Sequence, residues 1–329
     1  MNNPNISILV PICNVEKYLN KCLQSLVNQS IDNIEIICIN DGSKDSSLNI
    51  IKEFADKDKR IIVIDKVNTG YGDSMNRGLE IARGEYIGIV ESDDYAETEM
   101  FKELYELAKK HDADVVKSNF MFFWENPEKK VYENNLGISD VVYNTVNAKE
   151  SIFWGLPAIW SAVYKKEWLE KNNIRFLPTP GASYQDTSFN FKVACSAKKI
   201  VLTNKAYLNY RQDNANSSVK NTSLEKARML HKEWDEAERY MHAQGLDKYQ
   251  MYFETLKFNG LMWNYLRISA NDRMEYFREI SSCFNDESLI DVNHIRKYNK
   301  YGGLYALVHK KKRLLDLMLA IRSIIQNEK

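Results

Sequence analysis

The residues best suited to chemistry are three carboxylates that follow an apolar run. Glu91, Asp93 and Asp94 stand in the segment IGIVESDDY, directly after the strand-forming residues 86–90. At the carboxyl end of a buried strand in an open α/β sheet, such side chains lie where ligands bind. Clustered hard oxygen ligands suit Mg²⁺ or Mn²⁺ shared with a diphosphate. The alternative is that Asp94 caps the next helix and that the other two are solvated turn residues.

The elements that must position these carboxylates alternate between strand and helix over residues 5–124. Short apolar runs predict strands at 6–11, 34–39, 61–64 and 86–90, with amphipathic helices between them. This alternation favours an α/β fold with a mostly parallel sheet covered by helices. A further strand is predicted at 115–124, followed by a polar hairpin or loop.

The first two predicted strands also end in polar residues, on the same edge of the sheet as the carboxylates. The first ends in Pro11-Ile12-Cys13-Asn14 and the second in Asn40-Asp41-Gly42-Ser43. Asp41, with Gly42 permitting a tight turn, is suited to hydrogen-bond a nucleobase or ribose. The alternative for these residues is helix capping alone.

Composition narrows the classes of protein to consider. The 45 basic residues equal the 45 acidic ones, and no basic aromatic stripe is present, so we expect no nucleic-acid binding. The five cysteines form no CxxC pair and the histidines have no zinc-ligand spacing, which favours a reducing compartment and no zinc site. Neither a signal peptide nor an apolar run of spanning length is recognisable. We therefore expect a cytoplasmic protein.

The carboxyl-terminal third differs in character from the rest. From Leu224 onward the pattern is helical and rich in aromatic residues, which predicts a packed helical extension. Near the end, the basic run His309–Arg313 precedes an apolar helical face. Such a helix is suited to lie peripherally on an anionic membrane surface, and docking on the protein's own core is the alternative.

Three segments of the chain, in this order, resemble the motifs of a known protein family. The segments ISILVPICNVEKYLNKCLQSLVNQ, IEIICINDGSKDSS and NTGYGDSMNRGLEIARGEYIGIVESDDY resemble those of family-2 glycosyltransferases of the GT-A fold. The resemblance implies a GT-A domain over 1–222, with a nucleotide-binding half at about 1–124 and an acceptor-side half at about 125–222. Residues 223–329 would then form the helical extension.

The resemblance also implies roles for individual residues. Asp93 and Asp94 would hold Mn²⁺ or Mg²⁺, and Asp186, in QDTSF, would be the catalytic base unless it only caps a helix. The residues expected near the nucleotide sugar are Pro11, Asn14, Asp41, Asn68, Gly70, Asn76, Arg77, Glu91, Ser92, Asp93, Arg211 and Ser217. This chain departs from the family pattern at Glu91, Gln185 and Asp213, where aspartate, glutamate and histidine are usual.

The implied reaction is transfer of a sugar, with inversion, from a nucleotide sugar to an acceptor hydroxyl. We expect a UDP-sugar as the donor and a glycan or lipid-linked acceptor, in the synthesis of a surface polysaccharide or glycolipid. Two alternatives remain. The three departures keep open a pseudoenzyme that binds a nucleotide sugar without transferring it. A sugar-phosphate nucleotidyltransferase is disfavoured, because PICNVEKY stands where a glycine-rich phosphate loop would follow the first strand. A dinucleotide dehydrogenase fails for the same reason, since no GxGxxG follows that strand.

Overall fold

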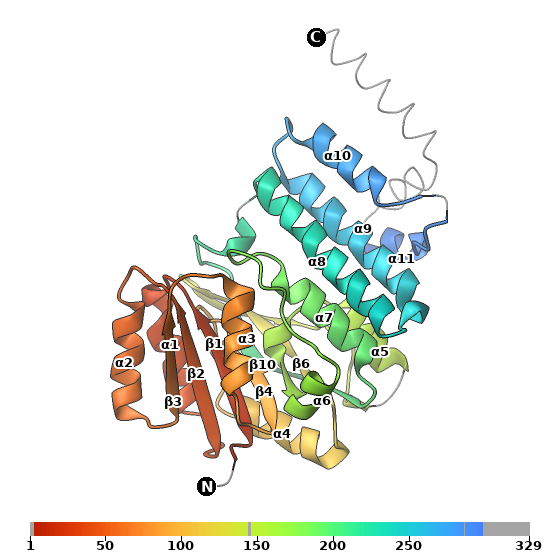
Figure 1. Cartoon of the computed structure of the whole chain (residues 1–329). Helices are drawn as coiled ribbons and strands as arrows, with labels where there is room; N and C mark the ends of the chain where they lie inside the picture. Colours follow the sequence, from red (N-terminus) through yellow and green to blue (C-terminus); the bar gives the residue numbers. More distant parts are fainter. Residues whose placement is uncertain (1–2, 144–145, 221, 286, 299–329) are drawn as a thin grey trace. The chain divides into compact units, whose positions relative to one another are not determined.

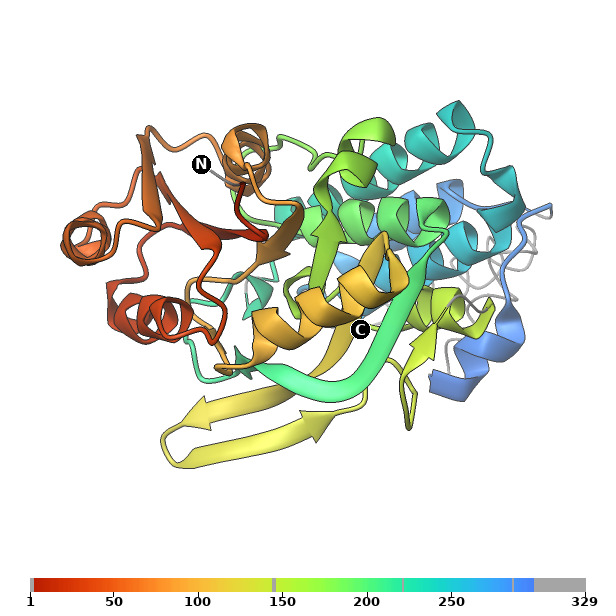
Figure 2. The same ribbon diagram turned by 90° about the horizontal axis from the view of Figure 1, so that it is seen from below.

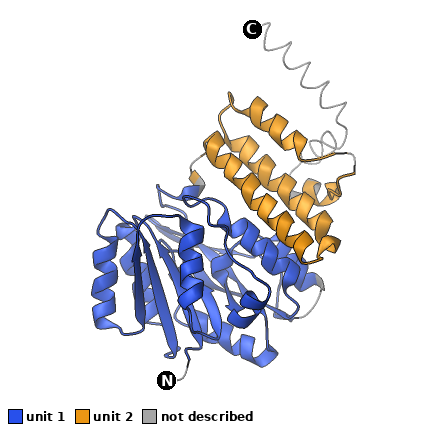
Figure 3. Ribbon diagram, viewed as in Figure 1, with its two compact units in different colours: residues 1–218 blue, residues 219–329 orange. Residues whose placement is uncertain are grey.

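The computed structural model describes residues 3–143, 146–220, 222–285 and 287–298. The chain divides into two compact units, residues 1–218 and 219–329 (Figure 3). The basic run at His309–Arg313 and the apolar face after it lie outside the described residues. Among the described residues, no helix combines the length and apolar character needed to cross a membrane.

The larger unit is built on a ten-stranded mixed sheet in its described part (Figure 1). The strand order is β3-β2-β1-β4-β9-β6-β10-β5, with β7 beside β6 and β8 beside β10. The strands are β1 (Ile6–Ile12), β2 (Ile34–Asp41), β3 (Ile61–Lys66), β4 (Tyr86–Ile89), β5 (Tyr95–Ala96), β6 (Val115–Glu125), β7 (Glu128–Glu133), β8 (Val142–Tyr143), β9 (Ala162–Lys165) and β10 (Ile200–Arg211). The four strands from β3 to β4 are parallel, as predicted.

Beyond β4 the pairing changes direction. β9 runs antiparallel to both β4 and β6, whereas β6 and β10 are parallel to each other. β6 continues into an antiparallel hairpin with β7, which extends from the sheet in Figure 2. The polar excursion predicted after residue 124 therefore begins as this hairpin.

Helices cover both faces of the sheet (Figure 2). On β4, a Cβ at Gly88 would lie 2.4 Å from the Phe101 ring of α4, so the two elements are in close contact there. Gly88 pairs with Val163, and the next residue on β9, Tyr164, points to the other face and contacts Phe189 of α7. The helices of this unit are α1 (Glu16–Val27), α2 (Ser47–Lys57), α3 (Tyr71–Ile81), α4 (Met100–His111), α5 (Val146–Trp154), α6 (Lys166–Lys171) and α7 (Gln185–Ser196), with the 3₁₀ turn η1 (Ile159–Ser161).

One lysine is buried within this sheet. Lys117 on β6 is 2% exposed, and its ammonium donates a hydrogen bond to the carbonyl of Ala158. The Ser161 hydroxyl donates to the same carbonyl at 2.9 Å. Burial lowers the pKa of Lys117 to about 7. The charged form of this side chain is therefore a cost to the folded state.

The smaller unit is helical, as predicted. It contains α8 (Leu224–Ala243), α9 (Gln250–Arg267), α10 (Arg273–Ser282) and α11 (Val292–Tyr298), with the short turn η3 (Asp247–Tyr249). The turn η2 (Ser218–Lys220) begins at the last residue of the larger unit. Its aromatic residues pack on one another, with Trp234 against Phe253 at 5.7 Å between ring centroids and Tyr265 against Phe277 at 5.5 Å. The aromatic pattern of the sequence thus belongs to a helix core.

Candidate active site

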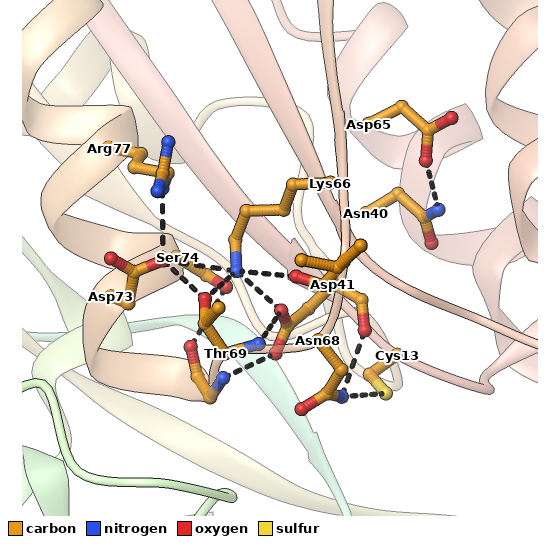
Figure 4. A network of polar contacts seen from close by, with 12 residues as sticks. Cys13, Asn40, Asp41, Asp65, Lys66, Asn68, Thr69, Asp73, Ser74 and Arg77 are labelled. Carbon is orange, nitrogen blue, oxygen red and sulfur yellow. Dashed lines mark hydrogen bonds and ion pairs between the residues drawn. The ribbon is translucent and has the colours of Figure 1, made fainter.

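The end of β2 is joined to the loop after β3 through Asp41 (Figure 4). The buried Asp41 carboxylate accepts hydrogen bonds from the Thr69 amide at 2.9 Å and the Gly70 amide at 3.0 Å, and it pairs with Lys66 at 2.5 Å. The Asn68 side chain donates to the Asp41 carbonyl at 2.9 Å. Gly70 has φ +102°, a backbone conformation that favours glycine. Asp41 therefore holds residues 66–70 in place.

The same network reaches the first turns of α3. The Thr69 hydroxyl accepts from Lys66 and donates to Asp73, and Arg77 pairs with Asp73 at 2.9 Å (Figure 4). The hydrogen bond from Thr69, with those from Arg77 and Lys66, lowers the pKa of Asp73 to about 2. The Arg77 side chain is half exposed beside the network.

Two further predicted residues connect separate loops. The side-chain oxygen of Asn14, just after β1, accepts a hydrogen bond from the backbone amide of Lys44 at 2.7 Å. The backbone amide of Asn14 donates to Ser43 Oγ at 3.1 Å. Pro11 lies buried in β1 itself. Asn76 on α3 exchanges two 2.9 Å hydrogen bonds with the backbone of Phe176. Asn76 thus fastens the loop before α7 onto α3.

The carboxylates after β4 have different surroundings. Asp94 is 1% exposed, and its Oδ1 accepts from the Arg211 amide at 2.7 Å. No donor among the described residues reaches Asp94 Oδ2, although that atom is buried. Burial raises the pKa of Asp94 well above its usual value, and the charge of Asp93 adds to the increase. Asp93 Oδ2 accepts a hydrogen bond from the Asn214 side chain at 2.8 Å. Ser92, which lies between Glu91 and Asp93 in the sequence, is buried.

Glu91 is held by a tyrosine from α3. The Tyr71 hydroxyl donates to Glu91 Oε1 at 2.7 Å. Burial raises the pKa of Glu91 to about 8; the hydrogen bond from Tyr71 acts in the opposite direction, and the negative charges of Asp93 and Asp186 add to the increase. Glu91 therefore shares its surroundings with Asp186, from a distant part of the chain.

Asp186 lies in the first turn of α7. Burial raises its pKa to about 6, while hydrogen bonds from the backbone and side chain of Thr187 lower it. Its charge is also felt by Tyr71 and Tyr210, whose pKa values it helps to raise. The preceding Gln185 is buried and binds the loop before α7, donating to Thr179 Oγ1 at 2.9 Å. The charge of Asp186 thus acts on Glu91 and on Tyr71, which are hydrogen-bonded to each other.

The end of β10 supplies a buried arginine. Arg211 Nε donates to the Asp93 carbonyl at 2.8 Å, and Nη1 pairs with Glu125 at 2.9 Å and Asp213 at 3.1 Å. Asp213 Oδ2 also accepts from the Glu125 amide at 2.7 Å. In this arrangement Arg211 positions the backbone around Asp93. Ser217 lies farther along, where its amide donates to the Asn214 carbonyl at 3.3 Å.

Comparison with known proteins identifies the family. The model of glycosyl transferase family 2 matches residues 7–172. The chain belongs to this family. Among its curated relatives, glycosyltransferase GlyA of Streptococcus pneumoniae serotype 4 is 35% identical over 215 residues, which are 63% of this chain and 30% of GlyA. EpsJ of Bacillus subtilis, described as an uncharacterized glycosyltransferase, is 32% identical over 64% of this chain and 62% of EpsJ. The chain thus spans less than two thirds of either relative.

Solved structures show the same fold. A crystal structure of S. aureus TarS, residues 1–349, aligns with a TM-score of 0.68 at 20% identity, covering 93% of this chain and 88% of that one. The complex of that protein with UDP-GlcNAc aligns with a TM-score of 0.67. The mannosyltransferase PcManGT of Pyrobaculum calidifontis, in complex with GDP-Man and Mn²⁺, aligns at 0.53 and 14% identity. The expected GT-A fold of family 2 with a helical carboxyl-terminal region is confirmed.

The residues after β4 are suited to share a cation with a ligand. The described residues contain no group of three or more His, Cys, Asp and Glu side chains arranged to hold a metal ion. Asp94 Oδ2 is nevertheless buried without a donor, which is a strong cost unless a ligand supplies a positive charge or a proton there. One or two carboxylates plus phosphate oxygens are the usual ligands of Mg²⁺. Asp93 and Asp94 therefore fit a cation only together with a diphosphate.

Sequence reasoning missed Tyr71, Asn214 and Lys66. Tyr71 stands between two glycines, and no local pattern predicts that its hydroxyl binds Glu91. That contact depends on how α3 packs in the fold. Asn214 ends the segment Tyr210–Asn214, which also resembles the family, but no role was predicted for it. Lys66 ends β3 on the same edge of the sheet as Asp41, so the strand-end argument could have found it.

Proposed function

We propose that this chain transfers a sugar from a nucleotide sugar to an acceptor hydroxyl. The observation that carries the proposal is the pair formed by the Tyr71 hydroxyl and Glu91 at 2.7 Å, because the charge of Asp186 helps to raise the pKa of both groups. This supports a base and a set of diphosphate-directed carboxylates that border one reaction centre. A pseudoenzyme would not need this base. TarS binds UDP-GlcNAc, which supports a UDP-sugar as the donor, and PcManGT binds GDP-Man, so the donor panel must include both nucleotides.

In this proposal, separate residues act on the nucleotide, the diphosphate and the acceptor. Asp41 and residues 66–70 would border the nucleotide, and Asn14 would fix the neighbouring loop. A divalent cation, Mn²⁺ or Mg²⁺, held by Asp93 and Asp94 would offset the negative charge of the departing diphosphate. Asp186 takes the proton of the acceptor hydroxyl. The acceptor oxygen then bonds to the anomeric carbon as the bond to the phosphate oxygen breaks, with inversion.

The acceptor class that the family favours is a growing glycan or a glycolipid of the cell surface, such as those made at the cytoplasmic face of a membrane. Among the relatives of this chain are a poly(ribitol-phosphate) beta-glucosyltransferase of Bacillus spizizenii and a cholesterol galactosyltransferase of Borreliella burgdorferi. Both act on large or lipidic acceptors according to their names. Peripheral membrane attachment belongs to the same proposal.

The proposal is tested by donor hydrolysis, which requires no knowledge of the acceptor. UDP- and GDP-sugars are incubated with the wild type, Asp94→Asn and Asp56→Asn, with Mn²⁺ present or chelated. Asp56 is an exposed aspartate on α2 and serves as the matched control. We expect one donor to be hydrolysed with Mn²⁺ by the wild type and Asp56→Asn, and not by Asp94→Asn. Binding of a donor without hydrolysis or transfer to any acceptor would favour the pseudoenzyme.

A further inference from the structure

Four aromatic rings form a continuous run near the proposed reaction centre. Trp160 of η1 lies 4.9 Å from Tyr210 of β10, Tyr210 lies 6.1 Å from Phe122 of β6, and Phe122 lies 6.4 Å from Trp124, all between ring centroids. Trp160 is buried, whereas the other three rings are partly exposed. We call these four residues the aromatic run. Large apolar rings left partly exposed in one place are typical of a ligand surface.

The backbone links the aromatic run to the residues around the carboxylates at two points. Tyr210 immediately precedes Arg211, whose amide binds Asp94, and Trp124 immediately precedes Glu125, whose carboxylate pairs with Arg211. Burial raises the pKa of Tyr210. Four negative charges add to this increase, those of Asp94, Asp186, Asp93 and Glu91. Tyr210 is therefore close to the proposed base as well as to the proposed cation ligands.

The sheet order places the aromatic run on the side away from the nucleotide. The strands β2 and β1, which end in the residues expected at the nucleotide, lie on one side of β4, and β9, β6 and β10 lie on the other. The donor would extend from Asp41 to the carboxylates after β4. The acceptor must then bring its hydroxyl to Asp186 from the other side, where the aromatic run lies.

The chemistry of the surface identifies the ligand. A pyranose ring has an apolar face of C–H groups and a rim of hydroxyls, so it can stack on an aromatic ring while its hydroxyls stay solvated or reach a base. We propose that the aromatic run is the acceptor subsite and that a pyranose ring of the acceptor glycan stacks on Trp124 and Phe122. This proposal rests on the proposed function, because Asp186 defines where the acceptor hydroxyl must lie.

The test measures binding of simple acceptor probes. Methyl glycosides of glucose, galactose, mannose and N-acetylglucosamine are titrated into the protein with UDP and Mg²⁺ and followed by saturation-transfer NMR. The variants are Trp124→Ala, Trp124→Tyr and the control Trp263→Ala. Trp263 serves as the control because it is 44% exposed in the helical unit and, like Trp124 with Lys129, has a cation over its ring.

We expect at least one glycoside to bind the wild type, Trp124→Ala to weaken that binding about tenfold, and Trp124→Tyr to restore most of it. Trp263→Ala should bind like the wild type. Equal binding by Trp124→Ala, or no binding of any glycoside to the wild type, would overturn the proposal. Donor hydrolysis is measured in parallel: hydrolysis without glycoside binding refutes the acceptor subsite alone, whereas absence of both refutes the proposed function.

Discussion

The role of Asp186 as a base predicts a specific pH dependence of transfer. Its pKa is raised to about 6 by burial, and the base acts only when ionised. The ionised fraction is about one tenth at pH 5 and about nine tenths at pH 7, so kcat/KM should rise about tenfold over this range and level off above it. Asp186→Asn should lower turnover about 10²- to 10⁴-fold and abolish this rise.

A neighbouring residue allows the origin of the rise to be tested. The hydroxyl of Thr187 donates a hydrogen bond that lowers the pKa of Asp186. Thr187→Val keeps the shape and the backbone amide but removes that hydroxyl, so the pKa should increase and the rise in kcat/KM should move to higher pH. The same substitution should leave the activity at the plateau within about threefold.

The assay is release of UDP from the best donor with an acceptor at low concentration, measured at each pH for the wild type, Thr187→Val and Asp186→Asn. Far-UV circular dichroism checks that each variant is folded. A profile without a rise near the pKa of Asp186, a Thr187→Val profile that coincides with the wild type, or an Asp186→Asn enzyme with nearly full activity would each refute the role of Asp186 as the base.

Three further substitutions change buried or hydrogen-bonded groups of the larger unit. Tyr71→Phe removes the hydroxyl that binds Glu91 and should lower the free energy of unfolding in urea by about 1–3 kcal/mol; an unchanged midpoint and slope would contradict this. Asn214→Ala removes the amide that orients Asp93 and should weaken Mn²⁺-dependent UDP binding about tenfold in calorimetry, with no comparable effect in EDTA. Lys117→Met should stabilise the fold by up to about 5 kcal/mol near neutral pH, since the pKa of the buried lysine falls from 10.5 to about 7. Because the unfolded chain binds one more proton between these pKa values, wild-type stability should increase with pH from about 7 to 10.5, and the variant should lack this increase.

The half of the sheet from β3 to β4 could be predicted from the sequence because its signals are local. Apolar runs end in polar residues at Asp41 and Asp93, and parallel strands bring such ends to one edge. β9 could not be predicted in the same way, since Ala162–Lys165 is short and its antiparallel pairing with β4 and β6 depends on tertiary packing.

The site shows the same division between local and long-range information. The carboxylates after β4 and Asp186 can be recognised from their own segments, but no local pattern predicts that the charge of Asp186 acts on Glu91. Likewise, the partners of Gln185 are carbonyl, hydroxyl and amide groups of a loop whose course depends on α3. Roles assigned from single positions also missed that Arg211 is buried among acidic groups and supports the backbone of Asp93.

We propose that Asp93 and Asp94 bind a cation together with the diphosphate of a nucleotide. Isothermal titration of UDP into the wild type, Asp94→Asn and the control Asp56→Asn, in Mn²⁺ and again in EDTA, tests it most directly. We predict that Mn²⁺ strengthens UDP binding at least about tenfold in the wild type and in Asp56→Asn, and has no such effect in Asp94→Asn. Equal UDP affinity of all three proteins in Mn²⁺, or no UDP binding by the wild type, would show that Asp93 and Asp94 do not hold such a cation.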